Sequence, residues 1–432
     1  MTGRIRRIGA WIAHSTETLL SAKTRKTVAR SIGGVGLFPA IITALGLGVV
    51  LAVAAQWILR RFIATSAAVA APIDVTKLSL TVVAGVGGTV ALVVAYRRQR
   101  DLEQGRFVER FGAAAAQLGA TDVAVRIAGV YAMAGVADES TGRRRQQCID
   151  VLCGYLRLPY DADHGASGRA KFVVKAPRVD HGRVRGETEE HIEYRQNDRE
   201  VRQTIVRVIA DHLRPTAEYS WSKNDFDFRT AYLEDADFSH ATFAGPARFG
   251  NARFSGVASF DDTTFSHIAS FERATFCDIA WFERAIFSDF AWFEDVMFCG
   301  LAQFGSVTFT IYTWFEGATF GSNAWFERAT FSSNTTFERA TFSGSARFGD
   351  VTFSGPTRFK DAKFSDTATF GGATFTGEAT FEMADFGAKT ISFAEPKQWG
   401  PPGPLFDWNE DVAQKPTNVE PHHWPPTTAT YV

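Results

Sequence analysis

The sequence has few cysteines, almost no net charge and none of the common catalytic motifs. Four cysteines in 432 residues are too few for a disulfide scaffold of this size. The formal net charge is −1, so bulk charge indicates no particular partner. Nine histidines are scattered, and HExxH, GxSxG and P-loop sequences are missing. We therefore expect no enzyme, no cofactor and no metal site.

The composition is that of a folded protein with unevenly distributed charge. Charged residues make up 22% of the chain and hydrophobic residues 45%, which excludes wholesale disorder. The length allows two or three domains. Residues 1–35 carry seven lysines and arginines against one acid, and we interpret them as a basic cytoplasmic segment.

Two charge-free stretches, 36–59 and 78–96, are each long enough to cross a bilayer as a helix. A cleaved signal peptide is the alternative for the first stretch, but the long preceding segment and the second stretch argue against it. Cations are concentrated before the first stretch and after the second. The pattern predicts a transmembrane hairpin over 36–96, in the cell membrane, with both termini cytoplasmic.

Helical periodicity predicts a small all-α adaptor module over 97–220. Its helices fall within 101–157 and 197–213, with Thr121 as an N-cap and Gly119 as a helix end. The segment 159–195 is rich in Gly, His, Arg and Glu, and we expect it to form a loop. Cys148 and Cys153 lack CxxC spacing, which favours buried thiols over a redox or metal pair.

Phenylalanine recurs with a strict period in the second half of the chain. From Phe238 to Phe386 it occupies all 28 positions separated by alternating steps of five and six. The residue two before each of these is Ala 21 times, Thr four times and Val three times. Residues i and i−2 share one side of a strand, so each unit predicts a short strand with one buried face. An α-helix would place phenylalanines five or six apart on opposite faces, which excludes it.

The units ADFSH, ATFAG, ARFGN and AKFSD resemble pentapeptide repeats, and the five–six spacing resembles the phenylalanine-rich branch of that family. The order of anchor, helical module and repeats is similar to membrane-anchored actinobacterial members. The resemblance implies a right-handed, four-sided parallel β-helix over 226–393. The composition of the following residues, 394–432, indicates a Pro-rich tail. Trp399, Phe406 and Trp408 are expected to cap the last coil of this rod, and the rest of the tail to be disordered.

Four faces give a coil of 22 residues and about seven coils for the array. Cys277 and Cys299 are 22 residues apart, so this arrangement stacks them on adjacent coils. Each inward phenylalanine contributes roughly 1.5–3 kcal/mol by burial. The structural core is represented by Phe271, Phe282, Phe293, Phe304, Phe315 and Phe326.

The surface of the predicted rod carries aromatic residues in two kinds of position. Four tryptophans stand immediately before an inward phenylalanine, and the extra residue of the longer step is apolar in the first half of the array. An exposed apolar belt of this kind is typical of a partner or dimer surface, whereas extra residues tucked into the corners are the alternative. The candidate interaction surface consists of Trp281, Trp292, Trp314, Trp325, Phe290 and Tyr312.

Acidic residues outnumber basic ones in the predicted rod. Residues 226–393 contain 21 acids and 12 lysines and arginines. Glu272, Glu294, Glu316 and Glu338 are 22 apart, and we expect solvated ion pairs with neighbouring arginines rather than a cation site. Members of this family that mimic DNA and protect gyrase suggest inhibition of a DNA-handling enzyme as an alternative function. Direct nucleic-acid binding is not expected, because the repeats contain no basic groove.

The sequence as a whole predicts a membrane-anchored cytoplasmic scaffold that presents a rigid β-helical rod for protein–protein contact. The expected partners are the lipid bilayer, a protein of unspecified identity and a second copy of the chain. No residue is assigned to catalysis, to a cofactor or to a metal.

Overall fold

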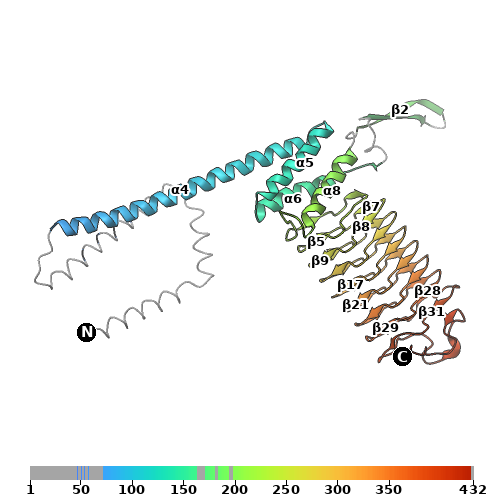
Figure 1. The fold of residues 1–432 in the computed structure, drawn as a ribbon. Helices are drawn as coiled ribbons and strands as arrows, with labels where there is room; N and C mark the ends of the chain where they lie inside the picture. Colours follow the sequence, from blue (N-terminus) through green and yellow to red (C-terminus); the bar gives the residue numbers. More distant parts are fainter. Residues whose placement is uncertain are drawn as a thin grey trace, which may run out of the picture. The chain divides into compact units, whose positions relative to one another are not determined.

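The structure, a computed structural model, describes residues 72–162, 171–180, 183–193 and 198–429, together with four isolated positions between 46 and 57. The chain divides into two compact units, Met1–Arg106 and Phe107–Val432, and each is described by itself. Figure 1 shows the helices and the stacked strands in chain order.

The first unit contains most of helix α4 (Pro72–Leu118), a helix of 47 residues. Residues 78–96 lie within it, whereas 36–59 falls outside the described residues except at four helical positions. In the ranges that the structure describes, no helix meets the length and apolarity that a bilayer crossing requires. The prediction of two transmembrane helices is therefore not supported there.

The helical module consists of the end of α4 with α5 (Val123–Asp138), α6 (Arg143–Leu156) and α8 (Asp198–Leu213). Its core contains Val130, Met133 and Leu152, all fully buried. The N-cap of α5 is Asp122 and not the predicted Thr121, because the Asp122 carboxylate accepts the backbone N–H of Ala124 at 2.7 Å. A carboxylate at this position also interacts favourably with the helix dipole.

The segment 159–195 contains more regular structure than the predicted loop. Strand β1 (Lys171–Asp180) pairs antiparallel with β2 (Arg183–Glu193) in a hairpin, with a register shift between Pro177 and Val179. Both strands contain β-branched residues, which favour extended backbone.

Residues from 226 onward form a parallel β-solenoid of the right-handed type, with one short strand on each of four faces per coil. The chain visits the faces in the order 1, 2, 3, 4, so faces 1 and 3 are opposite sides of the coil. Each face is a sheet of eight strands, except face 2, which has seven. The solenoid therefore has about eight turns, one more than predicted, because residues 226–227 add a strand to face 1 before the regular array and residues after Phe386 add strands to faces 3 and 4.

The strands follow one another along each face as parallel neighbours. Face 1 contains β3 (Phe226–Asp227), β6 (Ala247–Arg248), β10 (Ala269–Ser270), β14 (Ala291–Trp292), β18 (Thr313–Trp314), β22 (Thr335–Thr336), β26 (Thr357–Arg358) and β30 (Ala379–Thr380). Face 2 contains β4 (Tyr232–Glu234), β7 (Arg253–Ser255), β11 (Thr275–Phe276), β15 (Met297–Phe298), β19 (Thr319–Phe320), β23 (Thr341–Phe342) and β27 (Lys363–Phe364).

The other two faces are built in the same way. Face 3 contains β8 (Ala258–Ser259), β12 (Ala280–Trp281), β16 (Ala302–Gln303), β20 (Ala324–Trp325), β24 (Ala346–Arg347), β28 (Ala368–Thr369), β31 (Ile391–Ser392) and β33 (Val419–Glu420). Face 4 contains β5 (Thr242–Phe243), β9 (Thr264–Phe265), β13 (Ile286–Phe287), β17 (Thr308–Phe309), β21 (Thr330–Phe331), β25 (Thr352–Phe353), β29 (Thr374–Phe375) and β32 (Gln398–Trp399).

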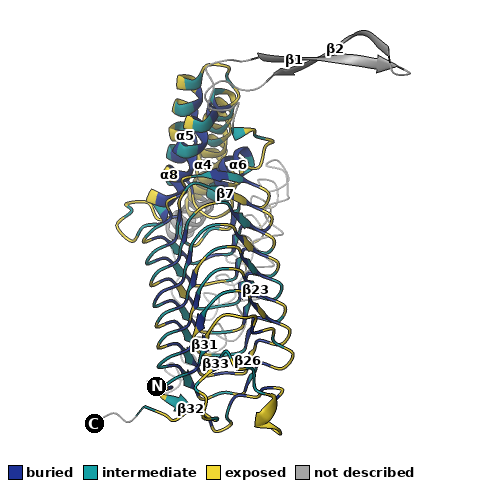
Figure 2. Ribbon diagram, turned by 90° about the vertical axis from the view of Figure 1, so that its right-hand side faces the viewer, coloured by how far each residue is buried: buried dark blue, intermediate teal, exposed yellow. Residues whose placement is uncertain are grey.

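Phenylalanine rings fill the interior of the solenoid in four stacks. Rings one coil apart on the same face are nearly parallel, as for Phe282 and Phe304, whose centroids are 4.8 Å apart at 3°. Rings on opposite faces meet edge to face, as for Phe271 and Phe282 at 5.5 Å and 88°. The alanines two residues earlier are also buried, which lets the walls of the coil approach closely. Figure 2 shows buried positions recurring along the coils of the solenoid. The six representative core residues, Phe271, Phe282, Phe293, Phe304, Phe315 and Phe326, are all fully buried.

The two step lengths correspond to two kinds of corner. The five-residue steps after faces 1 and 3 turn through a residue with positive φ, such as Arg273 (φ 53°) or Arg328 (φ 58°). The six-residue steps bring the backbones of neighbouring coils into close contact. A Cβ atom on Gly300 would lie 2.1 Å from the carbonyl oxygen of Asp278, so this corner requires glycine.

The tail over residues 394–429 is ordered, contrary to the expected disorder, and covers the last coil. Phe406 and Trp408 are buried, and the Phe406 ring stacks on Phe381 at 4.8 Å and 2°. Trp424 packs edge to face against Phe393, and Trp399 against Phe375. The predicted capping role of Trp399, Phe406 and Trp408 is confirmed, because these rings cover the phenylalanine stacks where no further coil follows.

Candidate interaction surface

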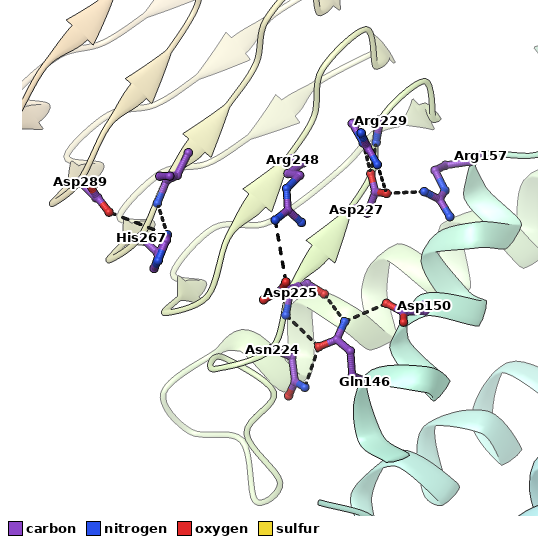
Figure 3. Close-up of polar contacts among 11 residues, drawn as sticks. Gln146, Asp150, Arg157, Asn224, Asp225, Asp227, Arg229, Arg248, His267 and Asp289 are labelled. Atoms are coloured by element: carbon purple, nitrogen blue, oxygen red, sulfur yellow. Dashed lines mark hydrogen bonds and ion pairs between the residues drawn. The ribbon is translucent and has the colours of Figure 1, made fainter. Parts of the chain in front are cut away.

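The helical module covers the first coil of the rod through polar contacts (Figure 3). The side chain of Gln146 on α6 donates to the carbonyl of Asp225 at 2.7 Å and accepts the backbone N–H of the same residue at 3.0 Å. Arg157 at the end of α6 pairs with Asp227 of β3, which Arg229 also binds at 2.8 Å. Because the tail covers the other end, the lateral faces are where the rod can meet a partner.

A buried polar network lies inside the helical module. Arg126 on α5 is fully buried and pairs with Asp198 at the start of α8 at 2.6 Å. The Tyr155 hydroxyl on α6 donates to the same carboxylate at 2.6 Å. The network joins all three helices, and we interpret it as structural. No sequence motif pointed to it, because its members are up to 72 residues apart.

The structure divides the predicted aromatic belt between two opposite faces. Trp292 and Trp314 are register partners on face 1. Trp281 and Trp325 lie on face 3, with Gln303 between them. The five–six spacing already places residues 11 apart on opposite faces of a 22-residue coil, so the sequence contained the signal for this division.

Face 1 holds a continuous aromatic cluster. Phe290 and Tyr312, at the corner before the strand, stack in parallel with centroids 5.9 Å apart. Trp314 lies 5.7 Å from each of these rings and 6.2 Å from Trp292. Tyr312 is exposed and the other three are half-buried. We call Phe290, Trp292, Tyr312 and Trp314 the aromatic cluster.

A series of glutamates follows the strands of face 1, two residues after each outward side chain. Glu272 pairs with Arg273, and Arg339 binds Glu316 at 2.6 Å. Glu294 has no ion-pair partner among the described residues. Burial, followed by the charges of Glu272 and Glu316, raises the pKa of Glu294 above its ordinary value. The ion pairs predicted for this series thus form at some of its members and not at Glu294.

The cysteines confirm the length of the coil. Thr275 and Phe276 pair in register with Met297 and Phe298, which places Cys277 and Cys299 on adjacent coils. Cys148 and Cys153 in α6 are buried free thiols, and burial raises their pKa values to about 11 and about 12. In the part of the chain that the structure describes, no three metal-ligating side chains converge.

Comparison with known families supports the interpretation of the repeats. The family described as pentapeptide repeats (9 copies) matches residues 228–275, 249–297 and 337–385. Searches of curated proteins and of solved structures found no match. The matched residues lie within the strands and corners described above, and the match names no catalytic family. Residues 228–297 and 337–385 of the solenoid therefore match the pentapeptide-repeat family.

Proposed function

We propose that this protein is a scaffold whose rigid solenoid docks a partner protein on face 1. The observation that carries the proposal is the aromatic cluster, in which four large rings stand at the surface of a regular backbone ladder. Large aromatic side chains dominate the binding energy of protein interfaces. Both ends of the rod are already covered, so a lateral face is the surface that can serve a partner.

The backbone under the cluster supports such a role. Each strand between the first and last of its face is held by ladder hydrogen bonds to the coils before and after it, as when the backbone N–H of Phe293 donates to the carbonyl of Trp314 at 2.7 Å. The rings therefore need little ordering when a partner binds, which reduces the entropic cost of association.

Crosslinking in cells followed by mass spectrometry tests the proposal. We expect crosslinks between face 1 and a partner protein, and their loss when Trp292 and Trp314 are both replaced by serine. Trp281 and Trp325 on face 3 provide the matched control pair. An unchanged set of crosslinks in the face 1 variant would contradict the proposed docking surface.

We further propose that the scaffold is held at a membrane through residues 36–96, with both termini cytoplasmic. The support is in the sequence, namely two charge-free stretches flanked by cations on their outer sides. Membrane fractionation with carbonate extraction tests this proposal. Release of the chain into the soluble fraction would refute it without affecting the docking role of the rod.

The alternative function, mimicry of DNA to inhibit or protect an enzyme such as gyrase, is less favoured by the surface charges. Several of the acids form ion pairs with arginines of the rod, including Asp262 with Arg284 at 2.8 Å and Glu316 with Arg339 at 2.6 Å. A DNA mimic needs free negative charge to attract a DNA-binding site. A gyrase supercoiling assay with and without the protein tests the alternative, and protection or inhibition would revive it.

A further inference from the structure

The sequence Trp-Phe-Glu occurs four times in the rod and always in the same geometry. The tryptophan is outward and half-buried, the phenylalanine is inward, and the glutamate begins the following turn. An indole and a carboxylate two residues apart therefore stand on the same outer side. The four copies start at Trp281, Trp292, Trp314 and Trp325.

On face 3, a side chain of the next coil contacts each Trp-Phe-Glu copy. Arg347 is the register partner of Trp325, and its guanidinium carbon lies 4.9 Å from the centroid of a Trp325 ring. The same guanidinium reaches the carboxylate of Glu327 at 3.6 Å. One arginine thus contacts both the indole and the carboxylate of a single copy. This combination of cation–π contact and ion pair suits a planar guanidinium.

The other copy on face 3 is served by an amide. Gln303 is the register partner of Trp281 and donates to the Glu283 carboxylate at 3.1 Å. The residue one coil further on therefore contacts the glutamate of each copy on this face, and Glu283 also pairs with Arg284 of its own coil at 2.8 Å.

At the two Trp-Phe-Glu copies on face 1, the register partners supply no such group, although Arg358 reaches Glu338 further along this face at 3.8 Å. The register partner of Trp292 on the next coil is Trp314, and the register partner of Trp314 on the coil after that is Thr336. Arg339 reaches Glu316 from a turn, and Glu294 has no ion-pair partner among the described residues. The two indoles and the Glu294 carboxylate therefore present the arrangement of the Trp325 copy without the arginine that fills it there.

We infer that face 1 binds arginine side chains of a partner protein, with each guanidinium stacked on Trp292 or Trp314 and paired with the neighbouring glutamate. This inference rests on the proposed docking function and specifies the chemistry of the partner. The acidic excess of the rod, 21 acids against 12 lysines and arginines, is complementary to a basic segment.

The spacing of the indoles indicates how the arginines are arranged. The Trp292 and Trp314 centroids are 6.2 Å apart. Alternate residues of an extended peptide are roughly 6.4–6.8 Å apart on one side. An extended segment with arginines at i and i+2, running along the rod axis, therefore places one guanidinium on each tryptophan.

Calorimetric titration of the full-length chain tests the inference. The probe is a Ser/Gly peptide with one Arg-Ser-Arg sequence, and its control has citrulline at both arginine positions. Citrulline keeps the planar shape and removes the charge. We expect the citrulline peptide, and each of the variants Trp314→Ser and Glu294→Gln, to weaken binding at least about tenfold. Trp325→Ser on face 3 is the matched control and should leave the affinity unchanged.

The possible results separate this inference from the proposed function. Equal binding of the arginine and citrulline peptides, or no effect of Glu294→Gln, overturns the inference even where cell crosslinks still depend on Trp292 and Trp314. If the cell crosslinks do not depend on Trp292 and Trp314, both the inference and the proposed docking function are overturned. Sedimentation analysis adds one further result. That result would be a dimer that the Trp314→Ser substitution dissociates and that the arginine peptide leaves intact. In that case the partner on face 1 is a second copy of this chain and not an arginine-bearing protein.

Discussion

The rod and the helical module stabilise their interiors in different ways. The rod buries one residue type in stacks that repeat every coil, so each coil provides the same environment as the next. The module buries a mixed set of side chains around the ion pair of Arg126 and Asp198, which occurs once and joins three helices. A periodic interior carries little information specific to one position. Differences between one part of the rod and another therefore lie on its surface, as the unlike tryptophan pairs of faces 1 and 3 show.

The largest expected effect tests the packing of the rod. Phe304→Ala removes a ring that stacks at 4.8 Å on Phe282 and on Phe326. We expect the free energy of unfolding to fall by about 3–5 kcal/mol, because neighbouring coils cannot collapse into the cavity. Chemical denaturation measures the loss, and hydrogen exchange shows whether protection decreases first in the adjacent coils.

The control for this variant is a phenylalanine on the outside. Phe290→Ala removes a half-buried ring from the aromatic cluster, and we expect a loss of about 1 kcal/mol or less. Equal losses for Phe290 and Phe304 would mean that the inward stacks are not what stabilises the solenoid.

The second prediction tests the helical module. Arg126→Met leaves the Asp198 carboxylate with Tyr155 and Arg202 as its remaining partners, so we expect a loss of about 2–3 kcal/mol. Replacing Asp198 by leucine in the same protein should restore part of the loss, because the buried carboxylate is then gone and the buried Arg202 keeps its hydrogen bonds to backbone carbonyl oxygens. A double variant less stable than Arg126→Met alone would contradict this account. The exposed pair of Arg110 and Glu139 is the control, and Arg110→Met should change stability by less than about 1 kcal/mol.

The two regions also differ in how far sequence determined their structure. The strict spacing of Phe238 to Phe386 predicted inward rings and a period of eleven, and the four-sided fold implied by the resemblance to pentapeptide repeats turned this period into a coil of 22 residues. The same spacing also places Trp281 and Trp292 on opposite faces of such a coil. The prediction nevertheless treated the tryptophans as one belt, because it considered only their apolar character. The contact of Arg347 with Trp325 could have been found from their 22-residue separation.

The Arg126–Asp198 pair could not have been found in this way. It depends on the packing of three helices that no period relates. The sequence also failed to predict that the tail is ordered. Its proline-rich composition is typical of a disordered segment, but its few aromatic side chains pack against the last coil.

The third prediction concerns the corners between the faces of the rod. The helical module has no equivalent of these corners. Gly300→Ala would place a Cβ atom 2.1 Å from the Asp278 carbonyl oxygen, so two coils must separate locally. We expect a loss of about 1–3 kcal/mol in the free energy of unfolding. Gly305→Ala is the matched control, since its Cβ would meet its nearest neighbour, Glu283 Cγ, at 3.7 Å, an ordinary contact. Similar losses for both glycines would show that coil spacing is not limited at this corner.

The smallest expected effect separates one surface carboxylate of the rod from its neighbours. Burial and the charges of Glu272 and Glu316 raise the pKa of Glu294 above its ordinary value of 4.5. Folding therefore strengthens proton binding at Glu294, so its ionisation opposes folding. This penalty is absent below pH 4.5 and develops as the pH rises through the folded pKa. Glu294→Gln should raise the stability of the free protein at neutral pH by less than about 1 kcal/mol and leave it unchanged in acid.

The matched control for this measurement is Glu316, whose carboxylate binds Arg339 at 2.6 Å. Glu316→Gln removes that ion pair, so it should bring no gain at neutral pH. Thermal unfolding of both variants between acid and neutral pH measures the difference. A gain for Glu316→Gln equal to that for Glu294→Gln would mean that the whole series of glutamates repels itself. Glu294 would then not be the one member left for an arginine from outside.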